Sequence, residues 1–599
     1  MNPLLLFRTL RHLRWTQLLA RPLRVGQFKL YRHSPHLAFR PTAAGADVSS
    51  VSPRTIETIR KTFSEQFAHL NTPLAEFDET LSGLKQNRFT FLNRSLTIQA
   101  TVDWNHRYES HLWNYQLHYF SFAPLTARAW VERGDDSAWR SCRELIQNWI
   151  VVAEPGRSDG WNEYPISLRV VNWIYAYALV AEREDEAFLA YWRASIFDQL
   201  GFLRGHLEHH LLANHLLKNV KALIVGGLFF QNEKWLDAGK LMLWREFREQ
   251  VLPDGGHYER SPMYHAQVLT DFLESYALLV VFRHLERYDK VDAQLQAMAD
   301  FLSAMSYADG SLALFNDSAN TVETRPQPIL ESARRIVGSA PQTATSGNLS
   351  FPQTGYYLWV SADGREKIIA DAGELSVAYN TAHAHCDLLS FELRLNGQPF
   401  IVDSGVHGYG GDRFREYCRS TRAHNTVMFD GGEQSEVWST FRMARRARLI
   451  DASAEGDGQT WSFRGSFARF GDGLIHERRI DRNFDGVWMV TDSAKGKASL
   501  ASSFVHLHPQ VEVKETNGSS VLCRLGSQQV LIEAFAEDGG NINVEVVSGG
   551  EAPIQGWYFS DFGIAEPSAT IRFDYQIGDG KKFGYTINAN HISLPILSA

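Results

Sequence analysis

The chain has 599 residues, more than one hydrophobic core usually holds, so two or more domains are expected. Its 44% hydrophobic and 21% charged residues are those of an ordinary globular protein. The net charge of −8 argues against nucleic acid as a partner, although a locally basic cleft could still bind an acidic polymer.

The N-terminal segment, residues 1–48, is basic. From Met1 to Ala46 there is no acidic residue, but eight lysines and arginines alternate with apolar residues. The arginines interrupt the apolar run too early for a secretory signal, and no apolar run is long enough to cross a membrane. We therefore expect a cytoplasmic or membrane-peripheral protein, with the periplasm as the alternative. The segment is either an amphipathic helix for an anionic membrane surface or an arm packed on the body of the protein.

Residues 49–340 have apolar residues at helical spacing. Successive helices are expected over residues 125–131, 139–152, 166–180, 186–203, 210–230, 235–251, 264–285 and 291–305. Short polar links join them, which is typical of helical hairpins. Several hairpins of similar length favour an incomplete (α/α) toroid around a cleft, and a plain helix bundle is the alternative.

In residues 341–599 the apolar period changes to two, which indicates strands. The expected strands include residues 356–360, 367–371, 475–482, 487–491, 511–514 and 541–547. Asp-Gly turn signals separate many of them, as in an antiparallel β-sandwich. The expected fold is thus an α+β multidomain chain, with a helical toroid followed by a β-sandwich.

Two places in the helical half depart from ordinary helix composition. Asn214 and His215 stand at the start of a long apolar run, where they could line the cleft or Asn214 could merely cap a turn. The loop from Asp254 to His265 is polar, contains glycine and leads through Ser261-Pro262 into a helix, as site-bearing loops often do. It contains Tyr264 and three candidates for substrate binding, Tyr258, Glu259 and Arg260. An N-capped helix with incidental tyrosines is the alternative.

A third group of residues could bind a sugar. Aromatic rings stack on sugar faces, and arginine pairs with a carboxylate or sulfate. The candidates for substrate binding here are Tyr115, Gln116, His118, Trp161 and Arg169. Each of them could equally be a structural residue.

The segment from His383 to Phe391 reads H-A-H-C-D-L-L-S-F, and Asp403 and His424-Asn425-Thr426 follow it. Asn396-Gly397 is a strong hairpin signal, and the returning strand would bring Asp403 back beside the H-x-H segment. Imidazole nitrogens and carboxylate oxygens suit Zn²⁺. The segment is therefore a candidate metal site, and a polar turn with scattered histidines is the alternative.

Taken in order, Asn214-His215, D-G-x-x-Y-E-x-S-x-x-Y-H ending at His265, H-x-H-x-D-x-L-S-F, V-D-S-G and H-N-T-V resemble the heparinase II/III-like polysaccharide lyases. That group includes oligoalginate and alginate lyases. The resemblance implies that Asn214, His215, Tyr264 and His383 are catalytic. It also implies that His385, Asp403 and His424 bind a structural zinc.

The expected reaction is β-elimination on a 4-linked uronic acid within an acidic polysaccharide. The enzyme would remove the proton at C5 and expel the oxygen at C4, so it must stabilise negative charge that develops on the carboxylate. Asn214 would hydrogen-bond that carboxylate. Tyr264 would serve as base, acid or both, or else His215 or His383 would take the proton.

Two other classes of function remain open. A glycoside hydrolase acting on an acidic glycan would need two carboxylates across a glycosidic bond, and Glu163, Glu259 and Asp254 could supply them. A non-catalytic glycan-binding protein of a polysaccharide biosynthesis system is the other. The basic N-terminus would suit a lyase near a membrane assembly for exopolysaccharide, with peripheral membrane contact.

Overall fold

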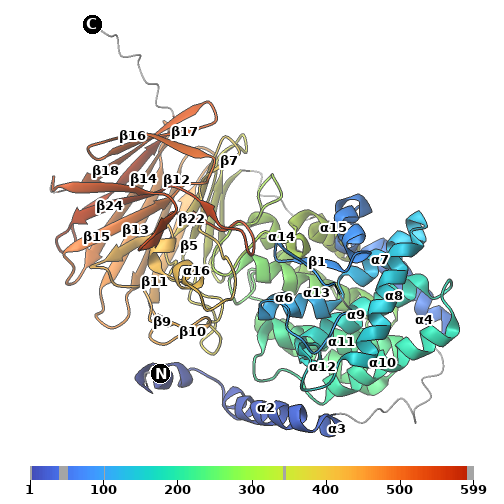
Figure 1. Cartoon of the computed structure of the whole chain (residues 1–599). Helices are drawn as coiled ribbons and strands as arrows, with labels where there is room; N and C mark the ends of the chain where they lie inside the picture. Colours follow the sequence, from blue (N-terminus) through green and yellow to red (C-terminus); the bar gives the residue numbers. More distant parts are fainter. Residues whose placement is uncertain (1–2, 39–50, 100, 341–345, 538, 590–599) are drawn as a thin grey trace.

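The computed structural model describes residues 3–38, 51–99, 101–340, 346–537 and 539–589. Its first half is helical and its second half consists of antiparallel sheets, which lie side by side in Figure 1. All four cysteines are buried and unpaired. Within the described ranges, no helix is both long and apolar enough to cross a membrane.

The helical half is an incomplete toroid of helix pairs. In it α9 packs on α7, α10 and α11, and α11 in turn packs on α12 and α13. Most residues of α9, α11 and α13 are buried, so these helices form the inner layer. The bounds are α4 Pro53–Gln66, α5 Asp78–Leu84, α6 His111–Tyr119, α7 Phe122–Arg133, α8 Asp136–Val152, α9 Glu163–Val180, α10 Glu186–Arg204, α11 Ala213–Phe230, α12 Glu233–Gln250, α13 Pro262–Val281, α14 Asp289–Ala304 and α15 Pro326–Val337.

Three large sheets make up the second half. Among the described strands, eight form one sheet in the order β11-β12-β13-β14-β25-β18-β17-β16, four form a second in the order β19-β24-β15-β8, and five form a third, β3 to β7. Every pairing within them is antiparallel. The bounds are β3 Gly347–Phe351, β4 Tyr356–Val360, β5 Lys367–Asp371, β6 Phe391–Leu395, β7 Gln398–Ile401, β8 Val427–Phe429, β11 Arg448–Gly456, β12 Trp461–Ala468, β13 Ile475–Arg482, β14 Val487–Lys495, β15 Leu500–His506, β16 Val511–Asn517, β17 Ser520–Leu525, β18 Gln528–Ala536, β19 Ile542–Val547, β24 Thr570–Gln576 and β25 Lys582–Asn588.

The five-stranded sheet is a middle layer between the two halves. Both faces of β4 are buried, because side chains alternate along a strand. Tyr356 and Leu358 pack with Phe301 of the helical half, whereas Tyr357 and Trp359 belong to the core of the sandwich. The predicted hairpin is present: β6 turns through Asn396-Gly397 into β7. The loops that leave this middle sheet therefore lie at the joint between the halves.

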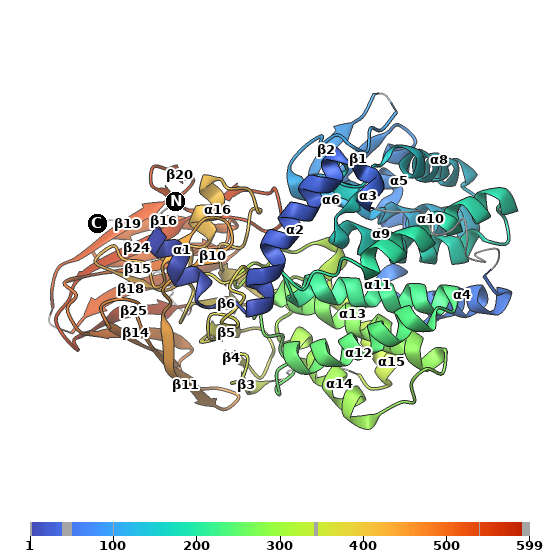
Figure 2. The ribbon, with the colours of Figure 1, turned by 90° about the horizontal axis from the view of Figure 1, so that it is seen from below.

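The N-terminal segment forms two helices outside the toroid, α1 Pro3–Leu10 and α2 Trp15–His33. Figure 2 shows α1 against the β half, and α2 running from the joint along the helical half. Short α3 Pro35–Ala38 follows. We call residues 3–33 the strap.

Candidate active site

Asn214 and His215 occupy the first turn of α11, where the chain enters the helix in an unusual conformation. Leu212 and Ala213 both have positive φ, 67° and 53°. The imidazole of His215 lies 2.9 Å, Nδ1 to Oε1, from buried Glu208. Although burial raises it, His215 and Asn219 lower the pKa of Glu208 below its usual value, so the carboxylate accepts the Nδ1 proton. This contact leaves Nε2 of His215 as the nitrogen that can accept a proton.

Tyr164 lies beside this pair. Its hydroxyl hydrogen-bonds the Asn214 side chain, and its ring centroid is 4.5 Å from that of His215. Predicted Tyr115 continues the row: its ring lies 6.4 Å from Tyr119, which lies 5.8 Å from Tyr164. The aromatic side chains thus extend from α6 to the start of α11. Gln116, on the same helix as Tyr115, is half-buried.

Tyr264 lies in the first turn of α13, where Ser261 caps the helix by accepting a hydrogen bond from the Tyr264 backbone N–H at 3.1 Å. Its hydroxyl is 2.8 Å from that of Tyr409, and its ring centroid is 3.9 Å from that of His383. Tyr264 is 6% exposed and His383 9%. Burial, with Tyr409 and Asp317 nearby, raises the pKa of Tyr264 well above its ordinary value. The phenol therefore keeps its proton at neutral pH.

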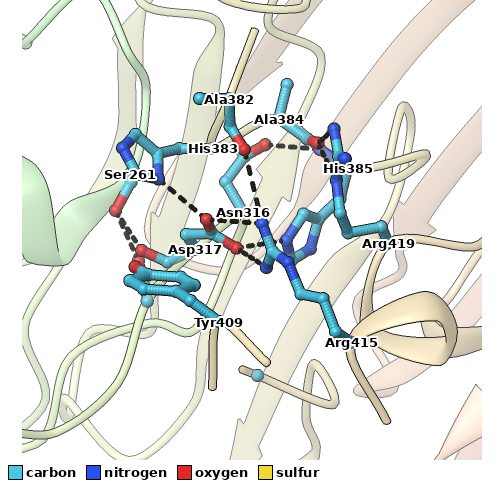
Figure 3. Close-up of polar contacts among 12 residues, drawn as sticks. Ser261, Asn316, Asp317, Ala382, His383, Ala384, His385, Tyr409, Arg415 and Arg419 are labelled. Atoms are coloured by element: carbon cyan, nitrogen blue, oxygen red, sulfur yellow. Dashed lines mark hydrogen bonds and ion pairs between the residues drawn. The ribbon is translucent and has the colours of Figure 1, made fainter. Parts of the chain in front are cut away.

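Asp317 joins the two histidines of the H-x-H segment (Figure 3). One carboxylate oxygen lies 2.8 Å from His383 Nδ1, and the other lies 2.7 Å from His385 Nε2. Arg415 donates to both oxygens, at 2.9 Å to Oδ2. Burial alone would raise the pKa of Asp317, but Arg415 and the two imidazoles hold it well below its usual range. A single buried carboxylate thus orients both rings.

Glu259 connects the α11 side of the site with the β half. It is fully buried; Asn380 donates to its Oε1 at 2.7 Å, and its Oε2 has no hydrogen-bond partner among the described residues. Burial raises the pKa of this carboxyl, whereas His383 and His215 lower it. Tyr264 and His383 are in ring contact at the joint, and Asn214 and His215 lie at the start of α11 beside Tyr164.

The metal prediction falls on a buried cluster of His385, Asp387 and His424, whose ligand atoms all lie within 4.8 Å of one another. His385 Nδ1 and His424 Nε2 are buried without a hydrogen-bond partner among the described residues. Because such orphaned nitrogens are costly, the cluster fits a divalent cation. Asp403 lies behind His424, with Oδ2 2.7 Å from Nδ1. The cluster therefore makes Asp387 a candidate ligand that was not among the predicted residues. Asp403 as a ligand remains a prediction.

Three of the predicted sugar-binding residues belong to the helical core. His118 is buried, its Nδ1 accepts a hydrogen bond from Trp149, and burial lowers its pKa to about 3. Arg169 is buried with its guanidinium on Trp149, and it donates to Gln199, to the His118 carbonyl and to the Gly160 carbonyl. Trp161 donates to the Ala153 carbonyl inside the same core. Since all three side chains are buried in the core of the helical half, we withdraw them as substrate-binding residues.

Two more of the predicted residues support the joint itself. Tyr258 is buried and hydrogen-bonds Tyr379. Arg260 donates through Nε to the Thr354 carbonyl at 2.8 Å and so ties the helical half to the β half.

The site also contains residues that the sequence reasoning missed: Glu208, Asp317, Tyr409 and Arg415. Asp317 stands in the polar run Asn316-Asp317-Ser318 between apolar residues, which looks like an ordinary turn. The one sequence signal that could have identified Asp317 is its position in a polar loop at the end of the helical half, since such loops often carry functional residues.

Comparison with known proteins defines the class: a protein with a helical toroid followed by a β-sandwich. A model described as the heparinase II/III N-terminus matches residues 56–336, and one described as heparinase II/III-like, C-terminal, matches residues 343–586. The chain therefore belongs to the heparinase II/III-like family.

Similar proteins agree with this placement. A heparin-sulfate lyase of Bacteroides thetaiotaomicron is 24% identical over 63% of this chain and 61% of its own length. The chain thus spans less than two thirds of that relative. FtsZ-localized protein C of Caulobacter vibrioides is 24% identical over 68% of this chain and 72% of its own. The crystal structure of a heparinase III superposes on this protein with a TM-score of 0.71 at 18% sequence identity. The match covers 91% of this chain and 94% of the heparinase III chain, and it shows the fold.

Proposed function

We propose that the protein is a polysaccharide lyase that cleaves an acidic polysaccharide with a 4-linked uronic acid by β-elimination. The observation that carries the proposal is the ring contact of Tyr264 with His383 at the joint of a lyase-family fold, with Asn214 and the Glu208-bonded His215 at the start of α11. The heparin-sulfate lyase relatives make heparan sulfate the first polymer to test.

The roles follow from the chemistry of each group. Asn214 supplies a neutral amide donor to the uronate carboxylate, where charge grows as the C5 proton leaves. The carboxylate would also face the first turn of α11, whose free backbone N–H groups favour an anion. These interactions strengthen as the transition state forms, which is what accelerates a reaction.

Proton transfer is divided between an imidazole and the phenol. Because the pKa of Tyr264 is raised by burial, its neutral hydroxyl suits protonation of the leaving C4 oxygen. Nε2 of His215 is free to take the C5 proton, since Glu208 holds the Nδ1 side of the ring. His383, oriented by Asp317, is the other candidate base. The stereochemistry of the substrate decides which of the two acts.

A zinc ion would be held by His385 and His424, with Asp387 or the predicted Asp403 as the carboxylate ligand. When bound, it would act structurally by tying together the loops that carry these residues. The catalytic roles above are carried by other side chains.

The test is direct. The full chain is incubated with heparan sulfate, hyaluronan and alginate, and absorbance in the ultraviolet band of a 4,5-unsaturated uronate is followed. Tyr264→Phe should lower turnover by roughly a hundredfold or more while leaving binding intact. Tyr276→Phe, on the same helix and with a hydroxyl that accepts from the Tyr288 backbone N–H, is the matched control and should stay active. An active Tyr264→Phe enzyme would refute the assignment.

The glycoside hydrolase alternative loses two of its three candidate carboxylates to other contacts, and Glu259 alone cannot supply the pair that it needs. Glu163 is paired with Arg24 of the strap. Asp254 accepts hydrogen bonds from Gln353 and Thr354. New reducing ends without the ultraviolet band would restore this alternative.

A protein without turnover is the second candidate. Its support is the similarity to FtsZ-localized protein C, whose name states a location and no reaction. Binding of an acidic polymer without either product signal would favour it. A link to exopolysaccharide and a contact of the N-terminus with a membrane both remain predictions.

A further inference from the structure

The strap is fastened to both halves of the protein. On the β half, Arg8 pairs with Glu436 at 3.1 Å, and Trp438 donates to the Thr9 hydroxyl at 3.0 Å. On the helical half, Tyr31 hydrogen-bonds His206 at 3.0 Å. The strap is therefore held in place, with a defined inner face and a defined outer face.

Polar and charged side chains of α2 point toward the protein. Arg24 is buried against Glu163, and Arg21 donates to the His210 carbonyl at 3.3 Å. Gln17 is only 1% exposed. Spacings of four and three residues place these side chains on one stripe of the helix. The face of α2 that touches the body thus carries these polar side chains, together with Tyr31, which packs on Phe202.

The outer face of α2 is apolar. Trp15 is 80% exposed, Leu19 65% and Leu23 68%, and Leu30 continues the row. At a hundred degrees per residue they lie on the side opposite Gln17 and Arg24. On α1, Leu4 and Phe7 are exposed as well. The usual arrangement of a surface helix is inverted here, and a contiguous exposed apolar row marks an interaction site.

Cations border this row. Arg11, Lys29 and Arg32 are exposed, and the sequence from residue 1 to 46 contains no carboxylate side chain to neutralise them. An apolar row with a tryptophan and flanking cations is complementary to an anionic lipid surface, where the helix lies in the interfacial plane. A protein partner would instead need an apolar groove that is bordered by acidic side chains complementary to these cations.

We propose that the outer face of the strap docks the protein on an anionic lipid bilayer. Docking leaves the inner contacts of α2 in place, so the strap need not detach from the body. The inference is independent of the lyase activity, because it depends on side chains that face away from the joint.

The experiment uses the full chain and sedimented vesicles. One set is pure phosphatidylcholine, and the other contains equal parts phosphatidylcholine and phosphatidylglycerol. We expect binding to the anionic vesicles only, weakened by added salt because the attraction is partly electrostatic. Trp15→Glu combined with Leu19→Glu should lower the partition coefficient at least roughly tenfold, since each side chain loses its apolar burial and adds an anion.

The matched control carries the same change elsewhere. Val151→Glu combined with Leu241→Glu replaces side chains that are 75% and 76% exposed on the helical half, and it should bind like the unchanged protein. Trp15→Ser combined with Leu19→Ser tests the loss of apolar contact without added charge. Failure of the unchanged protein to bind anionic vesicles would overturn the proposal, as would equal binding by the strap variants. A dimer in light scattering that the strap variants dissociate would overturn it in favour of a second copy.

Discussion

Asp317 has one carboxylate in contact with three cationic or ionisable partners. Its two oxygens divide the H-x-H segment, because each orients one histidine. His383 is thereby directed toward Tyr264, and His385 keeps its other nitrogen toward the metal cluster. This single residue would give the predicted difference in role between the two histidines a physical basis.

Asp317→Asn should lower both metal binding and turnover. The change leaves Arg415 buried without its counter-ion, which typically costs about 3–5 kcal/mol of stability. Urea unfolding measures that loss, and elemental analysis and turnover measure the metal and the activity. Asp309→Asn, which removes the half-exposed partner of Arg394, is the control. If the Asp317→Asn protein keeps its metal content and its turnover rate, the Asp317 carboxylate does not couple metal binding to activity.

The raised pKa of Tyr264 gives a prediction for alkaline titration. Ionised tyrosines absorb in the ultraviolet, and Tyr264 should contribute nothing to that signal up to about pH 10, its unperturbed value. The unchanged protein and Tyr264→Phe should therefore show equal phenolate absorbance in that range. Likewise, the rate should not rise between pH 8 and 10 through ionisation of Tyr264. If Tyr264→Phe shows less phenolate absorbance than the unchanged protein below pH 10, Tyr264 ionises in that range and could act as a base.

The candidate site residues were predicted from the family resemblance, but the contacts that orient them were not predictable. Asn214, His215, Tyr264 and His383 carried signals of their own, and the Asn396-Gly397 turn correctly predicted the β6–β7 hairpin. Asp317 and Arg415 are 98 positions apart, and no local pattern relates them. Arg169 and His118 show the opposite error, since a polar residue in a helix can equally serve the core.

At the scale of elements, the start of α11 carries backbone strain next to the site. Leu212 and Ala213 have positive φ, a conformation that costs a side chain roughly 1–2 kcal/mol. The neighbouring structure holds this bend, and it fixes where Asn214 and His215 begin.

Ala213→Gly should relieve the strain. We expect unchanged or slightly higher stability, by up to about 1 kcal/mol, because glycine accepts positive φ without cost. Turnover should fall several-fold, since the residues after the bend become less well positioned. Ala222→Gly, in the middle of the same helix, should instead cost at least roughly 1 kcal/mol. Thermal unfolding and initial rates measure both; a clear loss of stability in Ala213→Gly would contradict the strain.

Element boundaries followed from periodicity with good accuracy. The structure has strands at 356–360, 367–371 and 475–482, as predicted, and α9 and α10 end within a residue of the predicted positions. The orientation of the strap could not be predicted in this way, because periodicity identifies an apolar face of a helix but not whether that face contacts the protein or the solvent. Only the contacts of Arg24 and Gln17 show that this face is turned outward.

At the scale of the whole molecule, the middle sheet binds the two halves together. A cavity of about 700 Å³ opens at this joint, away from the catalytic group, and Tyr307, Glu392 and Arg394 line it. Nearby, Lys367 of β5 donates to the carbonyls of Ala304 and Ser306 at the end of the helical half. Burial lowers the pKa of Lys367 to about 7.

Lys367 should make the stability of the joint depend on pH. Between pH 7 and about 10.5 the unfolded chain binds a proton at this side chain that the folded protein releases, so stability should rise with pH across that window. Compared with Lys367→Met, the unchanged protein should gain roughly 1–3 kcal/mol from pH 6.5 to 9.5, allowing for a side chain that is only partly buried. Urea unfolding of both proteins at the two pH values gives the difference. No relative gain would mean that the lysine is charged when folded.

The strap also has a consequence for the order of events during synthesis. Arg8 and its partner Glu436 are 428 positions apart. At about 5–20 residues per second, α1 leaves the ribosome roughly 20–90 s before that partner exists. During this interval the leucines and arginines of the strap are available to a lipid surface while the β half is still unmade. Membrane capture would then come before folding, and the body would assemble against a helix that is already anchored.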